Sequence, residues 1–256
     1  MKRITVILLV IIFMLGVSGC MGNQDVNELQ ELFGQLIQNS TEKDIETAQN
    51  ALSLKYGCEF TVTHIGGRID SDSTTMYLTP DFDENLVVRA ELYQDSQQVR
   101  DNLIDRLVGR SFSKTLDDML KEKDVDISAW TSFVCSDRDQ EEDDINITVD
   151  EFTDKYHPEQ AMVYFALRQG SIDGSTAAKL TGAFSEMSKK YKVEIILHGV
   201  ILDEDYAECA AQIKDQTILT ATWFYDFKTT DAFRYAVTEG ESNLSDSELQ
   251  AILNGE

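Results

Sequence analysis

Short apolar segments with the two-residue period of strands alternate with longer segments that have the period of helices, between residues 41 and 253. Strands of this kind bury one face of a sheet, and helices of this kind bury one stripe. Short connections between successive strands favour antiparallel pairing. The pattern predicts an α+β fold in which antiparallel or mixed sheets are packed by helices.

The first half of this pattern predicts a helix, three strands, a long helix and a further strand. Thr41 and Asp44 have the spacing of a short capping box at the start of the first helix, and Gly57 is placed to end it. We expect strands at Cys58–Ile65, Thr74–Thr79, Leu86–Tyr93 and Ile127–Cys135, and a helical region at Gln97–Lys123 that Gly109 and Ser111–Ser113 interrupt.

The second half predicts a more regular alternation of strands and helices. Thr148 and Glu151 have the spacing of a capping box at the start of a short helix. We then expect strands at Ala161–Leu167, Val193–Leu202 and Ile218–Tyr225, and helices at Thr176–Tyr191, Asp205–Lys214, Phe233–Val237 and Asp246–Leu253.

An acidic segment, residues 137–146, separates the two halves and contains almost no apolar residue before Ile145. A charge run of this kind is typical of a solvated loop. The sequence therefore predicts an acidic linker at 137–146 between two small α+β subdomains, residues 41–136 and 147–256.

The amino-terminal residues have the composition of a signal peptide. Lys2 and Arg3 are followed by an apolar run from Val6 to Leu15, which is shorter than the roughly 20 apolar residues of a membrane-spanning helix. Ser18 and Gly19 supply small residues for cleavage. We expect a signal peptide at residues 1–19, followed at 20–40 by a tether and an amphipathic helix.

Val17-Ser18-Gly19-Cys20 resembles the lipobox of bacterial lipoproteins. The resemblance implies that the Cys20 thiol receives a lipid and becomes the mature amino terminus, held at the extracytoplasmic face of the cell membrane. The stretch from Lys55 to Arg68 also resembles uncharacterised lipoproteins of Gram-positive bacteria, which implies no particular activity.

The charge balance limits the partners of the chain. Its 256 residues carry 46 acidic and 22 basic side chains, for a net charge of −24. Such a chain repels nucleic acid and anionic lipid headgroups. A cationic or protein partner fits this charge, and so does simple solubility.

No motif for metal binding or catalysis is present. Cys58, Cys135 and Cys209 lie far apart without a Cys-x-x-Cys motif, and we expect buried thiols. His64, His157 and His198 lack metal-ligand spacing, and we expect His64 and His198 to be packed in strands. Calcium-loop spacing fails at Asp70 and Asp81, which leaves an improvised group of Asp70, Asp72, Asp81 and Asp83 as the alternative.

Two other stretches have structural interpretations. The segment from Gly170 to Thr176 resembles a phosphate loop but lacks its lysine, so we interpret it as a turn with Ser175 or Thr176 as the helix cap. In the predicted strand, Trp223 and Tyr225 would share one face and Phe224 the other. The exposed member of this aromatic group would be the place for a binding surface.

The sequence predicts a non-enzymatic binding or interaction module, with no catalytic, cofactor or metal site and with lipidation at Cys20. The alternative is an extracellular hydrolase that uses carboxylates on a wall or surface substrate, for which a cleft with buried carboxylates would be the evidence. A third option is an accessory protein of the immunity type.

Overall fold

The computed structural model describes residues 41–67, 72–135 and 142–255. The chain divides into two compact units, residues 1–47 and 48–256. Of the first unit, only the helical residues 41–47 are described, where Thr47 Oγ1 donates a hydrogen bond to Lys43 O at 2.8 Å. No helix among the described residues has the length and apolar character needed to cross a membrane.

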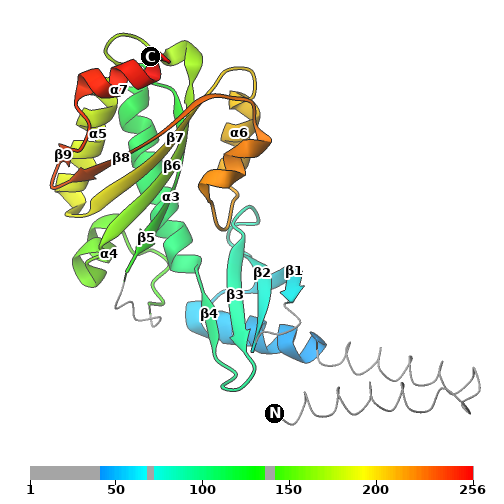
Figure 1. The fold of residues 1–256 in the computed structure, drawn as a ribbon. Helices are drawn as coiled ribbons and strands as arrows, with labels where there is room; N and C mark the ends of the chain where they lie inside the picture. The colour runs from blue at the N-terminus through cyan, green and yellow to red at the C-terminus, as the bar shows by residue number, and fades with distance from the viewer. Residues whose placement is uncertain (1–40, 68–71, 136–141, 256) are drawn as a thin grey trace, which may run out of the picture. The chain divides into compact units, whose positions relative to one another are not determined.

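The second unit contains two sheets, which confirms the predicted α+β class (Figure 1). The first sheet is antiparallel, in the order β1 (Phe60–Gly67), β2 (Ser73–Pro80), β3 (Val88–Tyr93) and β4 (Val99–Asp101). The second sheet is mixed, in the order β5 (Ile127–Val134), β6 (Gln160–Arg168), β7 (Glu194–Leu202), β8 (Thr229–Thr238) and β9 (Glu241–Ser242). Only the β6–β7 pair among them is parallel.

Helices pack against both faces of the second sheet. The helices α5 (Thr176–Tyr191) and α7 (Asp246–Leu253) lie on one face, where α4 (Val149–Tyr156) adds to the same core (Figure 1). The helix α6 (Tyr206–Ile213) and the 3₁₀ helix η2 (Ala221–Asp226) build a second, smaller core on the other face. The long helix α3 (Leu103–Lys121) connects the two sheets in the chain and packs against β5.

Several predicted helix termini are confirmed. The first helix ends at residue 56 and Gly57 follows with φ +69°, a left-handed conformation that glycine adopts without strain. The predicted capping box of Thr148 and Glu151 is formed. α7 has the predicted bounds, and it begins with a capping box of Ser245 and Glu248 that was not predicted. α5 has the predicted bounds.

Three secondary-structure predictions are wrong. A strand was predicted at Ile218–Tyr225, but the second part of this stretch belongs to the 3₁₀ helix η2. A helix was predicted at Phe233–Val237, but these residues belong to the strand β8. In β8 Phe233, Tyr235 and Val237 are buried and the residues between them are more exposed, which is the strand period. The helical region predicted from Gln97 begins instead with β4 and becomes helical only at Leu103.

α3 also continues without the predicted interruption at Gly109. The reason is its packing: a Cβ atom at Gly109 would lie 2.1 Å from the carbonyl oxygen of Thr131 in β5. Glycine is therefore required for a close approach of helix and strand, at the cost of its lower helix propensity.

The five-stranded sheet continues across the acidic segment. β5 precedes residues 137–146 and β6 follows them, and the two strands pair in antiparallel register from Ile127↔Leu167 to Val134↔Gln160. The boundary between the residues of the first sheet and those of the second lies between β4 and β5, and not at residues 137–146.

Glu142, in the middle of the acidic segment, is not the solvated side chain that a charge run predicts, because only 5% of it is exposed. Its Oε1 accepts hydrogen bonds from the N–H groups of Asp143 and Asp144. Its Oε2 accepts one hydrogen bond from Lys155 and one from Tyr156, and both of these are 2.9 Å long. Burial raises the pKa of Glu142, but the bonds from Lys155, Asp144 and Tyr156 outweigh burial and hold it at about 2.

We expect Glu142→Ala to destabilise the protein at neutral pH by about 2–3 kcal/mol, since four hydrogen bonds to a buried, charged acceptor are lost. The folded pKa lies below the ordinary 4.5, so this stabilisation is complete above pH 4.5 and disappears as the pH falls toward 2. Urea unfolding of both proteins between pH 3 and 7 measures it. Asp143→Ala, at an exposed neighbour, is the control, with an expected change of about 0.5 kcal/mol or less. Equal losses in the two variants would contradict the role of Glu142.

Candidate functional site

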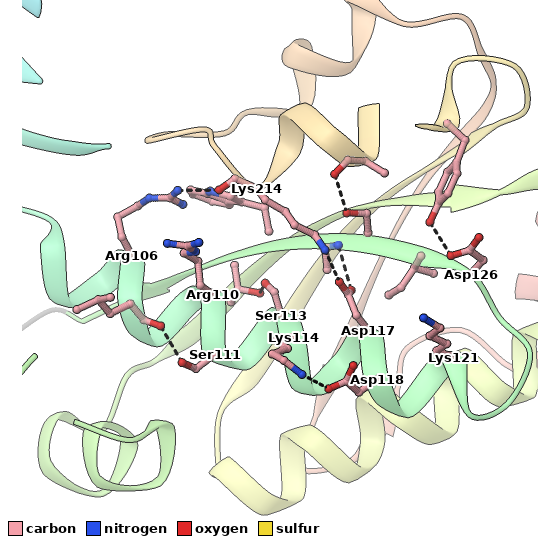
Figure 2. A pocket seen from close by; sticks show the side chains of 18 residues that line it. Arg106, Arg110, Ser111, Ser113, Lys114, Asp117, Asp118, Lys121, Asp126 and Lys214 are labelled. Carbon is pink, nitrogen blue, oxygen red and sulfur yellow. Dashed lines mark hydrogen bonds and ion pairs between the residues drawn. The ribbon is translucent and has the colours of Figure 1, made fainter. Parts of the chain in front are cut away.

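A cleft of about 710 Å³ lies along β5, between α3 and α6 (Figure 2). We call it the α3–α6 cleft. Residues 127–131 of β5 form its floor, α3 forms one wall, and Tyr206, Ala210 and Lys214 of the α6 region form the other. This volume is within the range of about 300–1,000 Å³ that is typical of small-molecule sites.

α3 is held against the outer edge of β5 by polar contacts as well as by Gly109. Asp117 Oδ1 accepts a hydrogen bond of 3.1 Å from the N–H of Ala129. The hydroxyl groups of Ser113 and Thr131 lie 2.8 Å apart, in hydrogen-bonding contact. These contacts cover the edge of the sheet, which would otherwise expose unpaired backbone groups, and they fix the position of the α3 side chains.

The cleft has the opposite charge balance from the whole chain. Helical spacing places Arg106, Arg110 and Lys114 on one face of α3, as Figure 2 shows. Cationic groups outnumber carboxylates among the lining side chains, which include Arg106, Arg110, Lys114, Lys121 and Lys214 against Asp117, Asp118 and Asp126. In the whole chain, acidic residues outnumber basic ones by 46 to 22.

The three carboxylates of the cleft are each paired with a cation. Asp118 Oδ2 lies 2.5 Å from Lys114 Nζ, and Asp117 Oδ2 lies 3.4 Å from Lys214 Nζ. Asp126 accepts a hydrogen bond of 3.0 Å from the hydroxyl group of Tyr206 and lies 3.5 Å from Arg168. These pairs hold the walls of the cleft in place.

The Asp117 carboxylate of the cleft has a raised pKa. Its side chain is 16% exposed. Burial raises its pKa to about 6, against the opposing effects of Lys214 and of the Ala129 N–H, and the neighbouring Asp118 adds to the rise. The folded protein thus binds this proton more tightly than the unfolded chain does, so stability falls as the pH rises from about 4 to about 6.

We expect Asp117→Asn to remove this fall and to stabilise the protein above pH 6 by about 1–2 kcal/mol. The amide oxygen still accepts from Ala129, and the ion pair with the half-exposed Lys214 contributes little. Thermal unfolding between pH 4 and 8 measures the effect. Asp118→Asn, at an exposed side chain, is the matched control and should keep most of the fall, because the charge of Asp118 is the smallest of the causes that raise the pKa of Asp117. A lower stability of Asp117→Asn at pH 7 would show that the charge of Asp117 stabilises the fold.

Arg106 lies at one end of the cleft and is 2% exposed. One of its terminal nitrogens donates a hydrogen bond of 3.0 Å to Lys214 O, and its guanidinium lies 5.7 Å from the centre of the Trp130 ring. The Trp130 indole N–H donates to Gln216 O at 2.8 Å, which fixes the ring in the floor. Among the described residues, Arg106 forms no ion pair and its Nε–H has no hydrogen-bond acceptor.

Of the candidate cysteines, histidines and aspartates singled out from the sequence, none that the structure describes lines this cleft. Cys20 lies outside the described residues, so its lipidation stays a prediction. Cys209 is buried as expected, and burial raises its pKa to about 12, whereas Cys58 and Cys135 are only half-buried.

The histidines do not come together in the described structure. His64 is exposed, which contradicts the expected packing, because a register shift between Val62 and His64 breaks the alternation of β1. His198 is half-buried and stacks on Tyr164 with ring centres 4.9 Å apart, and burial, with Arg234 adding to it, lowers its pKa. His157 is the exposed, left-handed C-cap of α4.

No group of three potential metal ligands occurs among residues 41–67, 72–135 and 142–255. Asp70, a member of the improvised calcium group, lies outside these residues. Asp83, another member, forms an ion pair of 2.7 Å with Arg110 at the cleft.

The segment from Gly170 to Thr176 is a turn that leads into α5, as interpreted. Ser175 occupies the N-cap position without a side-chain cap bond. The Asp173 carboxylate accepts hydrogen bonds from the N–H and the hydroxyl group of Ser175, both at 2.7 Å. A carboxylate of the chain thus takes the position that a bound anion would have.

The aromatic group of residues 223–225 is not arranged as a strand. In η2, Phe224 is buried in the smaller core, whereas Tyr225 is 80% exposed. Tyr225 is thus the exposed member of the group.

The sequence contains one signal for the cleft. Arg106, Arg110, Lys114 and Lys121 recur at helical spacing, a cationic stripe in an otherwise acidic chain. The partners on β5 and α6 could not be inferred, because they depend on how distant segments pack.

The observed structure is that of an α+β protein with a cationic cleft between a helix pair and a sheet edge. The sequence matches no protein-family model and no curated protein. A solved structure of a DUF5037 family protein from the Gram-positive bacterium Ruminococcus gnavus ATCC 29149 is similar, with a TM-score of 0.61 over 83% of this chain and 99% of that chain. At 11% identity this likeness shows a common fold, and the name of that family states no activity.

Proposed function

We propose that this protein is a lipid-anchored, extracytoplasmic binding protein that takes a small molecule into the α3–α6 cleft. The observation that carries the proposal is the cleft itself, with its volume of about 710 Å³ and with both apolar and charged side chains in its lining. The fold likeness to a protein of a Gram-positive bacterium fits the lipobox-like sequence at Cys20.

Binding fits the cleft better than catalysis does. A glycosidase needs two carboxyl groups directed at a substrate, one of them with a raised pKa. Asp117, with a pKa of about 6, favours this second candidate function. Its two oxygens, however, accept from Ala129 and pair with Lys214, and Asp126 is held by Tyr206 and Arg168.

The binding site is tested by a substitution that fills the cleft. Ala210 of α6 lines it, whereas the neighbouring Ala211 is exposed and does not. We expect compounds from a metabolite library to raise the melting temperature of the wild type and of Ala211→Trp, but not that of Ala210→Trp. The cleft would be refuted as the site if no compound raised the melting temperature of the wild type, or if the active compounds stabilised all three proteins equally.

The anchor is tested by Cys20→Ala in a Gram-positive host fed with labelled palmitate. We expect label in the wild type and in the matched variant Cys209→Ala, and none in Cys20→Ala. Label that persists in Cys20→Ala would exclude lipidation at this residue.

Turnover of wall polysaccharide that is lost in both Asp117→Asn and Asp126→Asn would favour the hydrolase instead.

A further inference from the structure

The charge of the α3–α6 cleft indicates which ligand it takes. In a chain with 46 acidic and 22 basic side chains, the lining of the cleft is predominantly cationic. The lining carboxylates already have cationic partners: Lys114 for Asp118, Lys214 for Asp117 and Arg168 for Asp126. A positive cleft on a negative surface attracts anions to that one place.

Arg106 is the strongest indication. A buried guanidinium is costly unless it is paired, and an unsatisfied buried donor adds to the cost. Arg106 is 2% exposed, it forms no ion pair with a described carboxylate, and its Nε–H has no acceptor there. A ligand oxygen at this end of the cleft would supply the missing charge.

Arg110 lies one helical turn further on, beside Arg106 (Figure 2). Burial, and after it the charge of Arg110, lowers the pKa of Arg106 to about 10, while Asp215 opposes them. Like charges one turn apart destabilise a helix, and an anion shared by the two guanidinium groups would relieve the repulsion. Arg110 already donates a hydrogen bond of 2.7 Å to the carboxylate of Asp83, so its guanidinium is placed to bind an oxyanion.

The rest of the cleft is suited to a less polar group. Leu107, Ile127, Ala129 and Trp130 also line it, and the Trp130 ring centre lies 5.7 Å from the Arg106 guanidinium. The Trp130 ring is fixed by its bond to Gln216 and offers a rigid apolar surface beside the cationic end.

Building on the proposed function, we propose that the ligand is a small organic anion, with a phosphate or carboxylate group held by Arg106 and Arg110 and an apolar or aromatic part against Trp130. Planar, forked guanidinium groups bind both of these oxyanions through paired hydrogen bonds.

The test uses the emission of Trp130. The chain has two tryptophans, so Trp223→Phe leaves Trp130 as the single reporter in the full chain, purified in a non-aromatic detergent. The probes are phenyl phosphate and benzoate, compared with benzyl alcohol and benzylamine, which have the same ring without the negative charge. We expect one or both anions to change the Trp130 emission in a saturable way. The neutral benzyl alcohol should bind at least about 10-fold more weakly, and the cationic benzylamine should not bind.

Arg110→Gln should weaken binding of the preferred anion at least about 10-fold, because a charged hydrogen-bonding group is lost. Arg100→Gln is the matched control, since it removes the same charge from an exposed position of β4 outside the cleft. If Arg110→Gln does not fold, Lys121→Gln replaces it. Lys121 lines the cleft, is exposed and forms no ion pair with a described residue, and the same direction of effect is expected.

The outcomes separate the two proposals. Equal binding of the anionic, neutral and cationic probes, with the same affinity in Arg110→Gln and Arg100→Gln, would overturn the anion inference and leave a binding cleft. No response of Trp130 to any probe at tens of millimolar, together with a metabolite library without active compounds, would overturn both. Preference for phenyl phosphate or for benzoate identifies the oxyanion.

Discussion

Gly109→Ala is expected to destabilise the protein by about 3 kcal/mol or more, the upper part of the range for overpacking. The added Cβ would lie 2.1 Å from Thr131 O and 3.1 Å from its carbonyl carbon, both backbone atoms of β5. No side-chain rotation can relieve this contact, so α3 must move away from the sheet edge. The hydrogen bonds of Asp117 to Ala129 and of Ser113 to Thr131 would then lengthen or break.

Gly182→Ala is the matched control for this prediction. Gly182 lies within α5, and a Cβ there would meet nothing within 4 Å. Alanine should therefore stabilise α5 by about 0.5–1 kcal/mol through its higher helix propensity. Urea unfolding of the two variants measures both effects. A Gly109→Ala variant as stable as Gly182→Ala would contradict the close approach of α3 and β5.

Phe112→Ala is expected to cost about 3–5 kcal/mol, as large-to-small changes at buried aromatic residues do. The Phe112 side chain is fully buried on α3. Its ring meets that of Phe133 in β5 edge-on, with centres 5.5 Å apart, and lies 5.4 Å from the ring of Tyr191 in α5. The substitution would leave a cavity where α3, α5 and the sheet meet.

Phe82→Ala provides the comparison, because this phenylalanine is 45% exposed. Its loss should change stability by about 0.5 kcal/mol or less. Thermal unfolding of both variants is the measurement. Similar losses for Phe112 and Phe82 would mean that Phe112 does not join α3 to the core.

The elements that could be predicted from the sequence are those with local signals. α5 keeps an uninterrupted helical period from Thr176 to Tyr191, and the helix at Thr148 has both residues of its capping box. Such signals depend on residues within one or two turns of each other, so the sequence contains them completely.

The wrong predictions concern elements that long-range packing decides. Residues 218–225 are rich in β-formers, yet Phe224 is buried among residues of α6 and the sheet as part of a 3₁₀ helix. β8 is a strand because it pairs with β7 over Ile195↔Val237 to Leu202↔Thr229. The predicted interruption at Gly109 is wrong because the strand that this glycine approaches cannot be identified from local sequence.

The cleft was missed for the same reason. Its cationic stripe on α3 is visible in the sequence, but Trp130 and Lys214 reach it from β5 and from the end of α6. Sequence motifs exist for common catalytic and metal sites, whereas this cleft depends on charge balance and on one buried arginine.

The central claim, that the α3–α6 cleft binds an anion at Arg106 and Arg110, is tested most directly by diffraction from crystals of the protein soaked in tungstate. Tungstate has the shape and charge of a phosphate-like oxyanion, and its tungsten atom is located by anomalous scattering. We predict a peak within hydrogen-bonding distance of the Arg106 and Arg110 guanidinium groups, lost in crystals of Arg110→Gln. Tungsten peaks confined to other surfaces, with an empty α3–α6 cleft, would contradict the claim.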